Sequence, residues 1–226
     1  MCGRAILNAS YDDLREIFGL HDLPELTPRF NIAPTQPIAI VREPGKLELV
    51  RWGLSGASAR EMRINVRGES VATAYRESFA SRRCLVVVDG FYEWKRSANV
   101  GRGASQPFVI RRGDGKPFAL AGIWARKVTP DGEVVDECAV VTGEAKGVVA
   151  EIHDRMPVIV ARESYARWLT ADAKDARALL APIAEPLTSY AVTTRVNAPA
   201  NDDAKCLEPA ASEESEPRKG NLTLFD

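Results

Sequence analysis

The sequence has 226 residues, of which 45% are hydrophobic, and a formal net charge of −1. A chain of this length and composition can bury one substantial core or two small ones, and we expect one domain followed by a tail. A bulk charge so close to neutral excludes a protein that holds nucleic acid over its whole surface. Any such surface has to be a local groove.

The sequence argues against a membrane or secreted protein. No apolar run approaches the ~20 residues of a membrane span, and the N-terminus lacks a signal pattern. The four cysteines, at positions 2, 84, 138 and 206, lack the close spacing of a zinc site. We therefore expect a cytoplasmic monomer that uses no metal and no cofactor.

The first residues, Met1 to Arg4, suggest a reactive N-terminus. Removal of Met1 would leave Cys2 with an α-amine, which titrates near ~8, beside a thiol that titrates near ~8.5. Such an aminothiol condenses with an aldehyde to a Schiff base, and the sulfur then closes a five-membered thiazolidine. The alternative is that Cys2 is a small buried residue at the start of an edge strand.

Local signals predict the first elements. Residues 4–7 form an apolar strand, and a helix should begin after Ser10 and end at Gly19. Strands over 37–41 and 47–52 flank a Pro-Gly turn, which indicates a hairpin.

The stretch 64–70 alternates polar and apolar residues. On an extended chain, Asn65, Arg67 and Glu69 would share one face. That face is either a polar recognition surface or the solvated side of an edge strand.

A buried strand is expected at 84–88, where apolar and mostly β-branched residues follow one another. It leads to Glu93, which stands between two aromatic residues. Partial desolvation there would raise the pKa of the carboxyl and suit it to proton transfer. The alternatives are a glutamate that points to water or pairs with Arg83 or Lys95.

The rest of the chain should be mostly antiparallel β with short helices. Strands 107–112 and 117–124 flank a Gly-Asp-Gly turn and predict a second hairpin. The remaining expected elements are a strand at 134–142, a helix at 146–152, helices at 163–169 and 172–180, and a strand at 190–194.

His153 is one of only two histidines in the chain. It stands between the helix expected at 146–152 and a strand that begins near Pro157. A histidine in this position is a potential proton donor near neutral pH. The alternative is a purely structural hydrogen bond.

Seven stretches together form an ordered pattern. They are Met1 to Arg4, Phe30 to Thr35, Arg51 to Gly53, Asn65 to Glu69, Gly90 to Trp94, Ile152 to Pro157, and Val196-Asn197 with Asn201. In this order they resemble the SOS response-associated peptidase (SRAP) family. The resemblance implies an α+β fold with a compact, antiparallel, barrel-like β core and short flanking helices.

The resemblance also implies a function in the DNA damage response. Members bind single-stranded DNA, cross-link themselves to abasic sites and shield those sites from cleavage, and they remove their own N-terminal residue. By matching motifs, the nucleophile is Cys2, the abasic-site sensor is Asn65, and the further catalytic residues are Glu93 and His153. We expect the protein to be nucleoid-associated and to have an AP lyase side activity through the Schiff base.

A single-strand groove needs aromatic surfaces for bases and cations for phosphates. Arg4 and Arg67 match arginines of the family that contact the strand, and Thr142 matches one residue of a family turn. The further expected DNA-binding residues are Trp52, Trp94, Arg82 and Arg83, with Phe91 as a third aromatic. The alternative is that the aromatic residues belong to the core.

Two other classes of function remain open at this stage. One is an N-terminal-nucleophile cysteine peptidase that acts mainly on peptides. The other is a non-catalytic module that binds single-stranded DNA and in which Cys2 is structural.

We expect the SRAP-like domain to cover residues 1–206 and a flexible tail to cover 207–226. The tail is rich in acidic residues and proline, as disordered linkers are. Its end, with Leu222, Leu224 and Phe225, resembles the short motif by which bacterial proteins dock on the replication sliding clamp. The alternative is a final strand that folds back onto the domain.

Overall fold

Five strands close into a barrel at the centre of the computed structural model, which describes residues 2–56, 61–96, 105–129, 131–181 and 186–211. They are β3 (Pro37–Glu43), β4 (Lys46–Trp52), β6 (Arg83–Val88), β9 (Phe118–Val128) and β10 (Val134–Glu144). The order around the barrel is β10-β4-β3-β6-β9, and the antiparallel pairing of β9 with β10 closes it.

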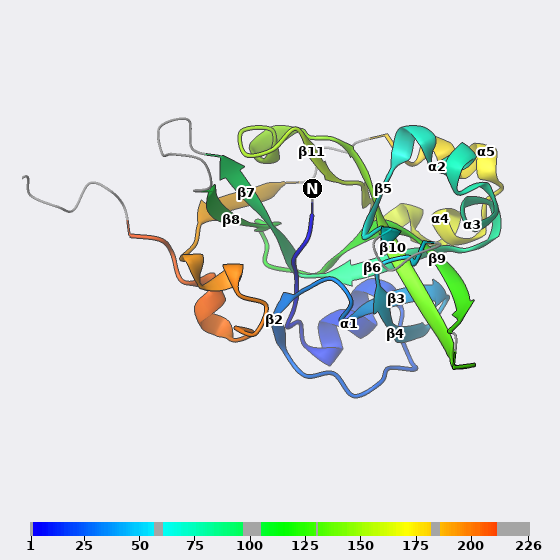
Figure 1. The fold of residues 1–226 in the computed structure, drawn as a ribbon, viewed down its shortest axis with the longest axis horizontal. Coiled ribbons are helices and arrows are strands. Elements are labelled where there is room, and N and C mark those ends of the chain that lie inside the picture. The colour runs from blue at the N-terminus through cyan, green and yellow to red at the C-terminus, as the bar shows by residue number, and fades with distance from the viewer. Residues whose placement is uncertain (1, 57–60, 97–104, 130, 182–185, 212–226) are drawn as a thin grey trace, which may run out of the picture.

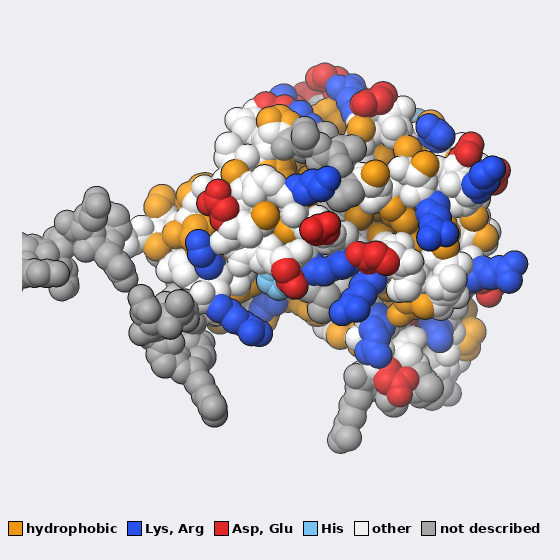
Figure 2. Space-filling model, turned by 90° about the horizontal axis from the view of Figure 1, so that it is seen from above, with side chains coloured by type: hydrophobic (Ala, Val, Ile, Leu, Met, Phe, Trp, Pro, Cys, Tyr) orange, Lys and Arg blue, Asp and Glu red, His pale blue; other side chains and the backbone are white. Residues whose placement is uncertain are grey.

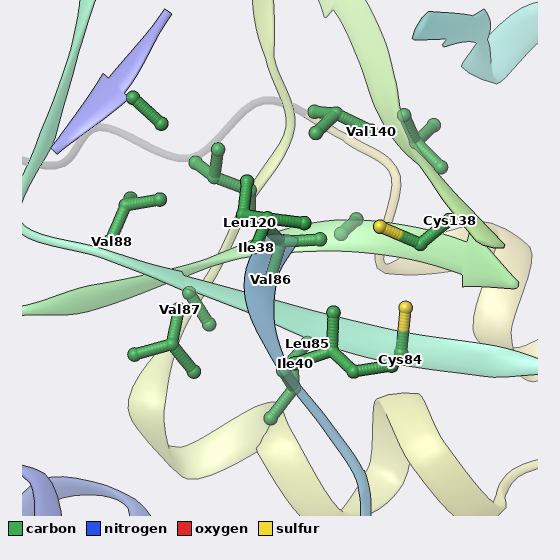
Figure 3. Close-up of a cluster of buried hydrophobic side chains, with 14 of the residues drawn as sticks. Ile38, Ile40, Cys84, Leu85, Val86, Val87, Val88, Leu120, Cys138 and Val140 are labelled. Atoms are coloured by element: carbon green, nitrogen blue, oxygen red, sulfur yellow. The ribbon is translucent and has the colours of Figure 1, made fainter. Parts of the chain in front are cut away.

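Apolar side chains fill the barrel. Figure 3 shows them converging from β3, β6, β9 and β10, among them Ile38, Val86, Leu120 and Val140. All six residues of β6 are buried, because the strand lies between its barrel neighbours and the helix α4 (Tyr165–Thr170). Trp168 of that helix donates its indole N–H to the carbonyl of Cys84, at 2.8 Å.

A second, open sheet lies beside the barrel, in the order β13-β8-β7-β1-β2. Its strands are β1 (Ala5–Leu7), β2 (Arg29–Ile32), β7 (Gly90–Arg96), β8 (Ser105–Arg112) and β13 (Leu187–Ala191). The face of this sheet that bears Ile6, Tyr92 and Val109 carries a separate apolar cluster. Two 3₁₀ turns, η4 (Thr194–Asn197) and η5 (Ala204–Leu207), contribute Val196 and Cys206 to that cluster.

Short helices and strands complete the fold. In Figure 1, α2, α3, α4 and α5 gather on one side of the barrel and α1 lies below it. The remaining elements are α1 (Tyr11–Phe18), α2 (Gly68–Ala74), α3 (Arg76–Ser81), α5 (Ala173–Ala178), β5 (Asn65–Arg67), β11 (Arg155–Pro157), β12 (Ile159–Val160), η2 (Gly147–Val149) and η3 (Arg162–Ser164). Within the described ranges, every helix is too short or too polar to pass through a lipid bilayer.

The predicted α+β fold with a barrel-like core is confirmed, and so are several local predictions. Ser10 accepts a hydrogen bond from the amide of Asp13 at 3.1 Å, and Gly19 ends α1 with a φ of 64°. The hairpin of β3 and β4 is also present. The helix predicted at 146–152 is reduced to the single 3₁₀ turn η2.

The hairpin predicted around Gly113 to Gly115 is wrong. β8 pairs with β7 and β13 in the open sheet, whereas β9 pairs with β6, β10 and β12 in the barrel sheet. The turn therefore carries the chain from one sheet to the other. The two strands differ in burial in a way that fits their separate sheets. β9 begins with six consecutive buried residues, as a strand inside the barrel sheet does, whereas β8 has half-buried residues at both ends.

The extended segment predicted at 64–70 is shorter than expected. Only Asn65–Arg67 form a strand, β5, and it pairs in parallel with β10. Glu69 lies in the first turn of α2, so it does not share a strand face with Asn65 and Arg67.

The main chain stays paired past the predicted domain boundary at residue 206. The turn η5 continues to Leu207, and the carbonyl of Glu208 accepts a hydrogen bond from the amide of Thr193 at 3.0 Å. The amide of Ala210 donates to the carbonyl of Ala191 at 2.9 Å. The expected clamp-binding residues Leu222, Leu224 and Phe225 lie outside the described residues.

Arg83 belongs to the interior, so its prediction as a DNA-binding cation is wrong. Its side chain is 4% exposed. The guanidinium donates hydrogen bonds to carbonyls that end two helices, namely those of Phe79, Ala80 (3.1 Å), Trp168 (2.6 Å) and Ala171. These bonds join α3 to α4 across the start of β6.

We predict that Arg83→Met lowers the free energy of unfolding by about 3 kcal/mol, because it leaves several buried carbonyls without a donor. Urea unfolding measures the change. The neighbouring Arg82→Met is the matched control, since Arg82 pairs with Glu77 at the surface, and it should stay within about 0.5 kcal/mol of the wild type. Equal stability of both variants would contradict the structural role of Arg83.

Candidate functional site

Cys2 lies three residues before β1, which pairs with β2 and β7 in the open sheet. Ala5 pairs with Phe91, and the amide of Tyr92 donates to the carbonyl of Arg4 at 3.1 Å. Continuing this antiparallel register places the segment before Arg4 beside Glu93. Cys2 is fully buried, and its thiol donates to the carbonyl of Arg4 at 3.8 Å.

Asn65 holds Cys2 from the barrel side. Its side-chain amide donates to the carbonyl of Cys2 at 2.7 Å. The position of Asn65 is set by β5, in which it pairs with Val140 of the barrel strand β10. The amide oxygen of Asn65 is buried and has no hydrogen-bond partner among the described residues. A buried acceptor of this kind is suited to a hydroxyl group of a ligand.

Glu93 is the buried carboxyl of the site, with 1% exposure. Burial raises its pKa to about 7, while the positive charge of the N-terminus works in the opposite direction. The pKa of the Cys2 thiol is also raised, by burial first and by the nearby Glu93 carboxylate second. At neutral pH the thiol is therefore protonated and the carboxyl is close to half ionised.

The surroundings of His153 favour a neutral imidazole ring over a protonated, cationic one. The amide of Arg155 donates to its Nδ1 at 3.0 Å, which puts the proton of the neutral ring on Nε2. Desolvation lowers the pKa of His153, and the positive N-terminus adds to this, although Asp154 lies 2.7 Å from Nδ1 and favours the charged form. The neutral ring can still donate a hydrogen bond through Nε2.

A cleft of about 640 Å³ opens next to these residues. Its lining combines cations, an aromatic ring and the His153 segment: Arg67, Trp94, Lys95, Arg96, Glu151, Ile152, His153 and Asp154. Figure 2, which views the molecule over the side of β11 and α2, shows Lys and Arg interspersed with Asp and Glu rather than gathered into one patch. The positive charge of the cleft is thus local, as the net charge of the chain requires.

Several predicted DNA-binding residues do not line this cleft. The prediction that Trp52 and Thr142 contact DNA directly is wrong, because both side chains are fully buried. Trp52 donates its indole N–H to the carbonyl of Ile64 at 3.0 Å, and Thr142 Oγ1 donates to the carbonyl of Val66 at 3.3 Å. Phe91 is core, as the alternative reading had it.

The predicted cations differ in their surroundings. Arg67 is exposed and lines the cleft. Arg4 is half-buried, donates to the carbonyl of Gly3 at 2.9 Å, and has a pKa lowered by desolvation. Arg82 pairs with Glu77 and is not part of the cleft lining.

The sequence analysis missed Arg155. Its guanidinium makes a two-point ion pair with Glu69, at 2.6 and 2.9 Å, and donates to the carbonyl of Thr142 at 2.7 Å. Its backbone amide orients His153. The sequence signal for Arg155 is its position two residues after His153, because its partner Glu69 is distant in sequence and lies in α2 rather than in the expected extended segment.

The described part of the chain contains no group of three or more His, Cys, Asp or Glu side chains that could hold a metal ion. The four cysteines are all buried and free.

The family described as SOS response associated peptidase (SRAP) matches residues 1–199. The chain belongs to the SRAP family. The abasic site processing protein YoqW of Bacillus subtilis is 33% identical to this SRAP chain over 225 residues, which cover 92% of this chain and 99% of YoqW. The abasic site processing protein YedK of Escherichia coli is 27% identical over 229 residues, which cover 92% and 100%.

A solved structure supports the same fold for this SRAP chain. A crystal structure of a protein from Bordetella bronchiseptica superposes with a TM-score of 0.73 at 26% identity. The superposition covers 85% of this chain and 100% of the other.

We predict that Glu93→Gln becomes more stable relative to the wild type as the pH rises. The folded-state pKa of about 7 lies above the unfolded value of about 4.3, so the contribution of the neutral carboxyl is fully present below pH ~4.3 and is lost as the pH rises through 7. Between pH 5 and pH 8 the difference in unfolding free energy should shift by about 2 kcal/mol in favour of the variant. Urea unfolding at several pH values measures it.

Glu69→Gln is the control for this titration. The ion pair with Arg155 lowers the pKa of Glu69 to about 2, so both its folded and unfolded pKa values lie below pH 5. Its stability difference from the wild type should therefore be constant from pH 5 to pH 8. A constant difference for Glu93→Gln as well would show that Glu93 is not a buried, titrating carboxyl.

Proposed function

We propose that this protein senses abasic sites in single-stranded DNA and captures them covalently through Cys2 once Met1 has been removed. One observation carries the proposal: Asn65 holds the main chain of Cys2 through a 2.7 Å hydrogen bond, close to the buried carboxyl of Glu93, whose pKa is raised to about 7. An α-amine released at that position would face a carboxyl that is able to exchange protons with it at neutral pH. The adduct would protect the site from strand cleavage.

The chemistry is a condensation that releases water. The amine lone pair of Cys2 attacks the aldehyde carbon of the opened sugar, a C–N bond forms, and the oxygen takes up a proton. Loss of that oxygen as water leaves an iminium ion. The sulfur of Cys2 then adds to the same carbon, a C–S bond closes the thiazolidine, and the thiol proton leaves. The raised pKa of the buried thiol favours this order, because the sulfur is not a free thiolate at the start.

Glu93 would serve both directions of proton transfer. With a pKa of about 7, its carboxylate can take the proton from the amine and its acid form can return one to the leaving oxygen. The same group would assist the loss of Met1, so self-processing as a peptidase is part of the proposal. Because Glu93 takes up one proton and returns one, the carboxyl is regenerated in the reaction.

Asn65 and His153 would recognise the sugar. The side-chain oxygen of Asn65, which has no hydrogen-bond partner among the described residues, can accept a hydrogen bond from a hydroxyl group of the abasic deoxyribose. A nucleoside with an intact base would not present a hydroxyl group at that place. The Nε2–H of a neutral His153 can donate to the sugar ring oxygen and favour opening to the aldehyde. Arg4, Arg67 and Trp94 would hold the strand on either side.

We predict that mature wild-type protein gains the mass of an abasic oligonucleotide, less one water, and gains nothing from an intact oligonucleotide. Cys2→Ala should lose the heat-stable adduct, because no sulfur is present to close the ring. Its amine still forms the imine, so strand cleavage by β-elimination should increase relative to capture. Intact mass measurement and denaturing gels report both results.

The outcomes separate the competing functions. Heat-stable adducts from Cys2→Ala would exclude the thiazolidine. Retained DNA binding without any covalent shift would favour a non-catalytic module, and turnover of unrelated peptides would favour a general peptidase. Replacement of Glu93 by glutamine should slow adduct formation more than it weakens binding of the DNA.

We predict that binding depends steeply on salt and that long intact duplex competes poorly with single strands. Arg67→Ala should weaken binding of all sequences alike and reduce the slope of log K against log salt by about 1. Arg82→Ala, outside the cleft, is the matched control and should leave the slope unchanged. Equal competition by duplex would contradict a groove for single strands.

A further inference from the structure

Trp94 lies at the boundary between the cleft and the second apolar cluster. It follows Glu93 in β7, and successive residues of a strand point to opposite faces. Glu93 therefore faces the Cys2 side of the sheet, whereas Trp94 packs against the cluster that contains Tyr92 and Val196. Its remaining surface lines the cleft.

Asn197 fixes the orientation of this ring. The indole N–H of Trp94 donates to Oδ1 of Asn197 at 2.8 Å. An indole has a single polar atom, so this bond selects one rotation of the ring about its side-chain torsions. Asn197 itself is exposed, so the bond lies at the molecular surface.

The main chain that carries Asn197 is held in place by hydrogen bonds, although the Asn197 side chain is exposed. Asn197 ends the turn η4, and Val196 beside it is fully buried. The buried side-chain amide of Asn31 donates to three carbonyls of this segment, those of Val196 (3.1 Å), Ala198 (3.1 Å) and Asn201 (2.7 Å). The side chain of Asn201 closes the segment on the carbonyl of Arg195 at 2.9 Å.

We infer that Asn197 is a positioning residue for base stacking in the cleft. By fixing the Trp94 ring, it presents one indole face to the nucleobase next to the abasic site. The interaction would select strands that carry a stackable base beside the lesion. The inference rests on the proposed function and adds to it a preference for the neighbouring base.

The test uses two single-stranded oligonucleotides that contain a tetrahydrofuran abasic analogue, which has no aldehyde and cannot cross-link. One has adenines on both sides of the analogue, and the other has further tetrahydrofuran units there, so that no neighbouring base can stack. Fluorescence anisotropy gives the dissociation constant of each. The ratio of the two constants isolates stacking from phosphate contacts, which both strands share.

For wild-type protein the strand with adenines should bind about tenfold more tightly, as expected for one stacked base. Asn197→Ala should reduce this ratio about fivefold while the strand without neighbouring bases binds as before. Asn197→Asp keeps the acceptor oxygen and should restore the ratio, even if its charge weakens both constants. In a Trp94→Phe background, which removes the indole N–H, Asn197→Ala should have no further effect.

A ratio that Asn197→Ala leaves unchanged would overturn the inference, and so would a change that persists in the Trp94→Phe background. Equal weakening of both strands by Asn197→Ala would also overturn it, because that result indicates a general structural role. Thermal melting of each variant identifies such a role directly. Failure of the wild type to bind either oligonucleotide would instead contradict the proposed function.

Discussion

The main-chain pairing of β1 is the constraint on which the site depends. A strand of only three residues lies between β2 and β7, and its end is fixed by the buried carboxyl of Asp89, which accepts a hydrogen bond from the amide of Asn8. Because β1 is anchored there, Cys2 at its start has one position relative to Glu93. The main chain of Cys2 is thus positioned by the backbone pairing of β1 and by the side-chain amide of Asn65 rather than by contacts of the thiol.

The barrel supplies the opposite wall of the site. Strand β10 pairs with β5, which carries Asn65 and Arg67, and with β11, which begins at Arg155 next to His153. The open sheet supplies Glu93 and Trp94. The groups therefore converge where the open sheet packs against the barrel, and the main apolar cluster contains residues of both sheets. A loss of packing between the two sheets would change the separation of these groups.

The sequence allowed the fold class, α1 and most strands to be predicted, because caps, turn residues and apolar runs are local signals. It also proposed Cys2, Asn65, Glu93 and His153 as candidate site residues, and the structure brings these segments together. The choice of strand partners could not be predicted in the same way: β8 and β9 flank an excellent turn signal yet belong to different sheets. The interior positions of Trp52 and Arg83 likewise depend on distant carbonyl acceptors.

The complete burial of Cys2 bears on the chemical safety of a reactive N-terminus. An exposed aminothiol would condense with any small aldehyde that reached it. Here the thiol is enclosed, and the groups that would activate the amine come from segments far apart in the chain, so they come together only in the folded protein. Under the proposed chemistry, the folded protein would therefore react with a carbonyl compound that enters through the cleft rather than with one in bulk solvent.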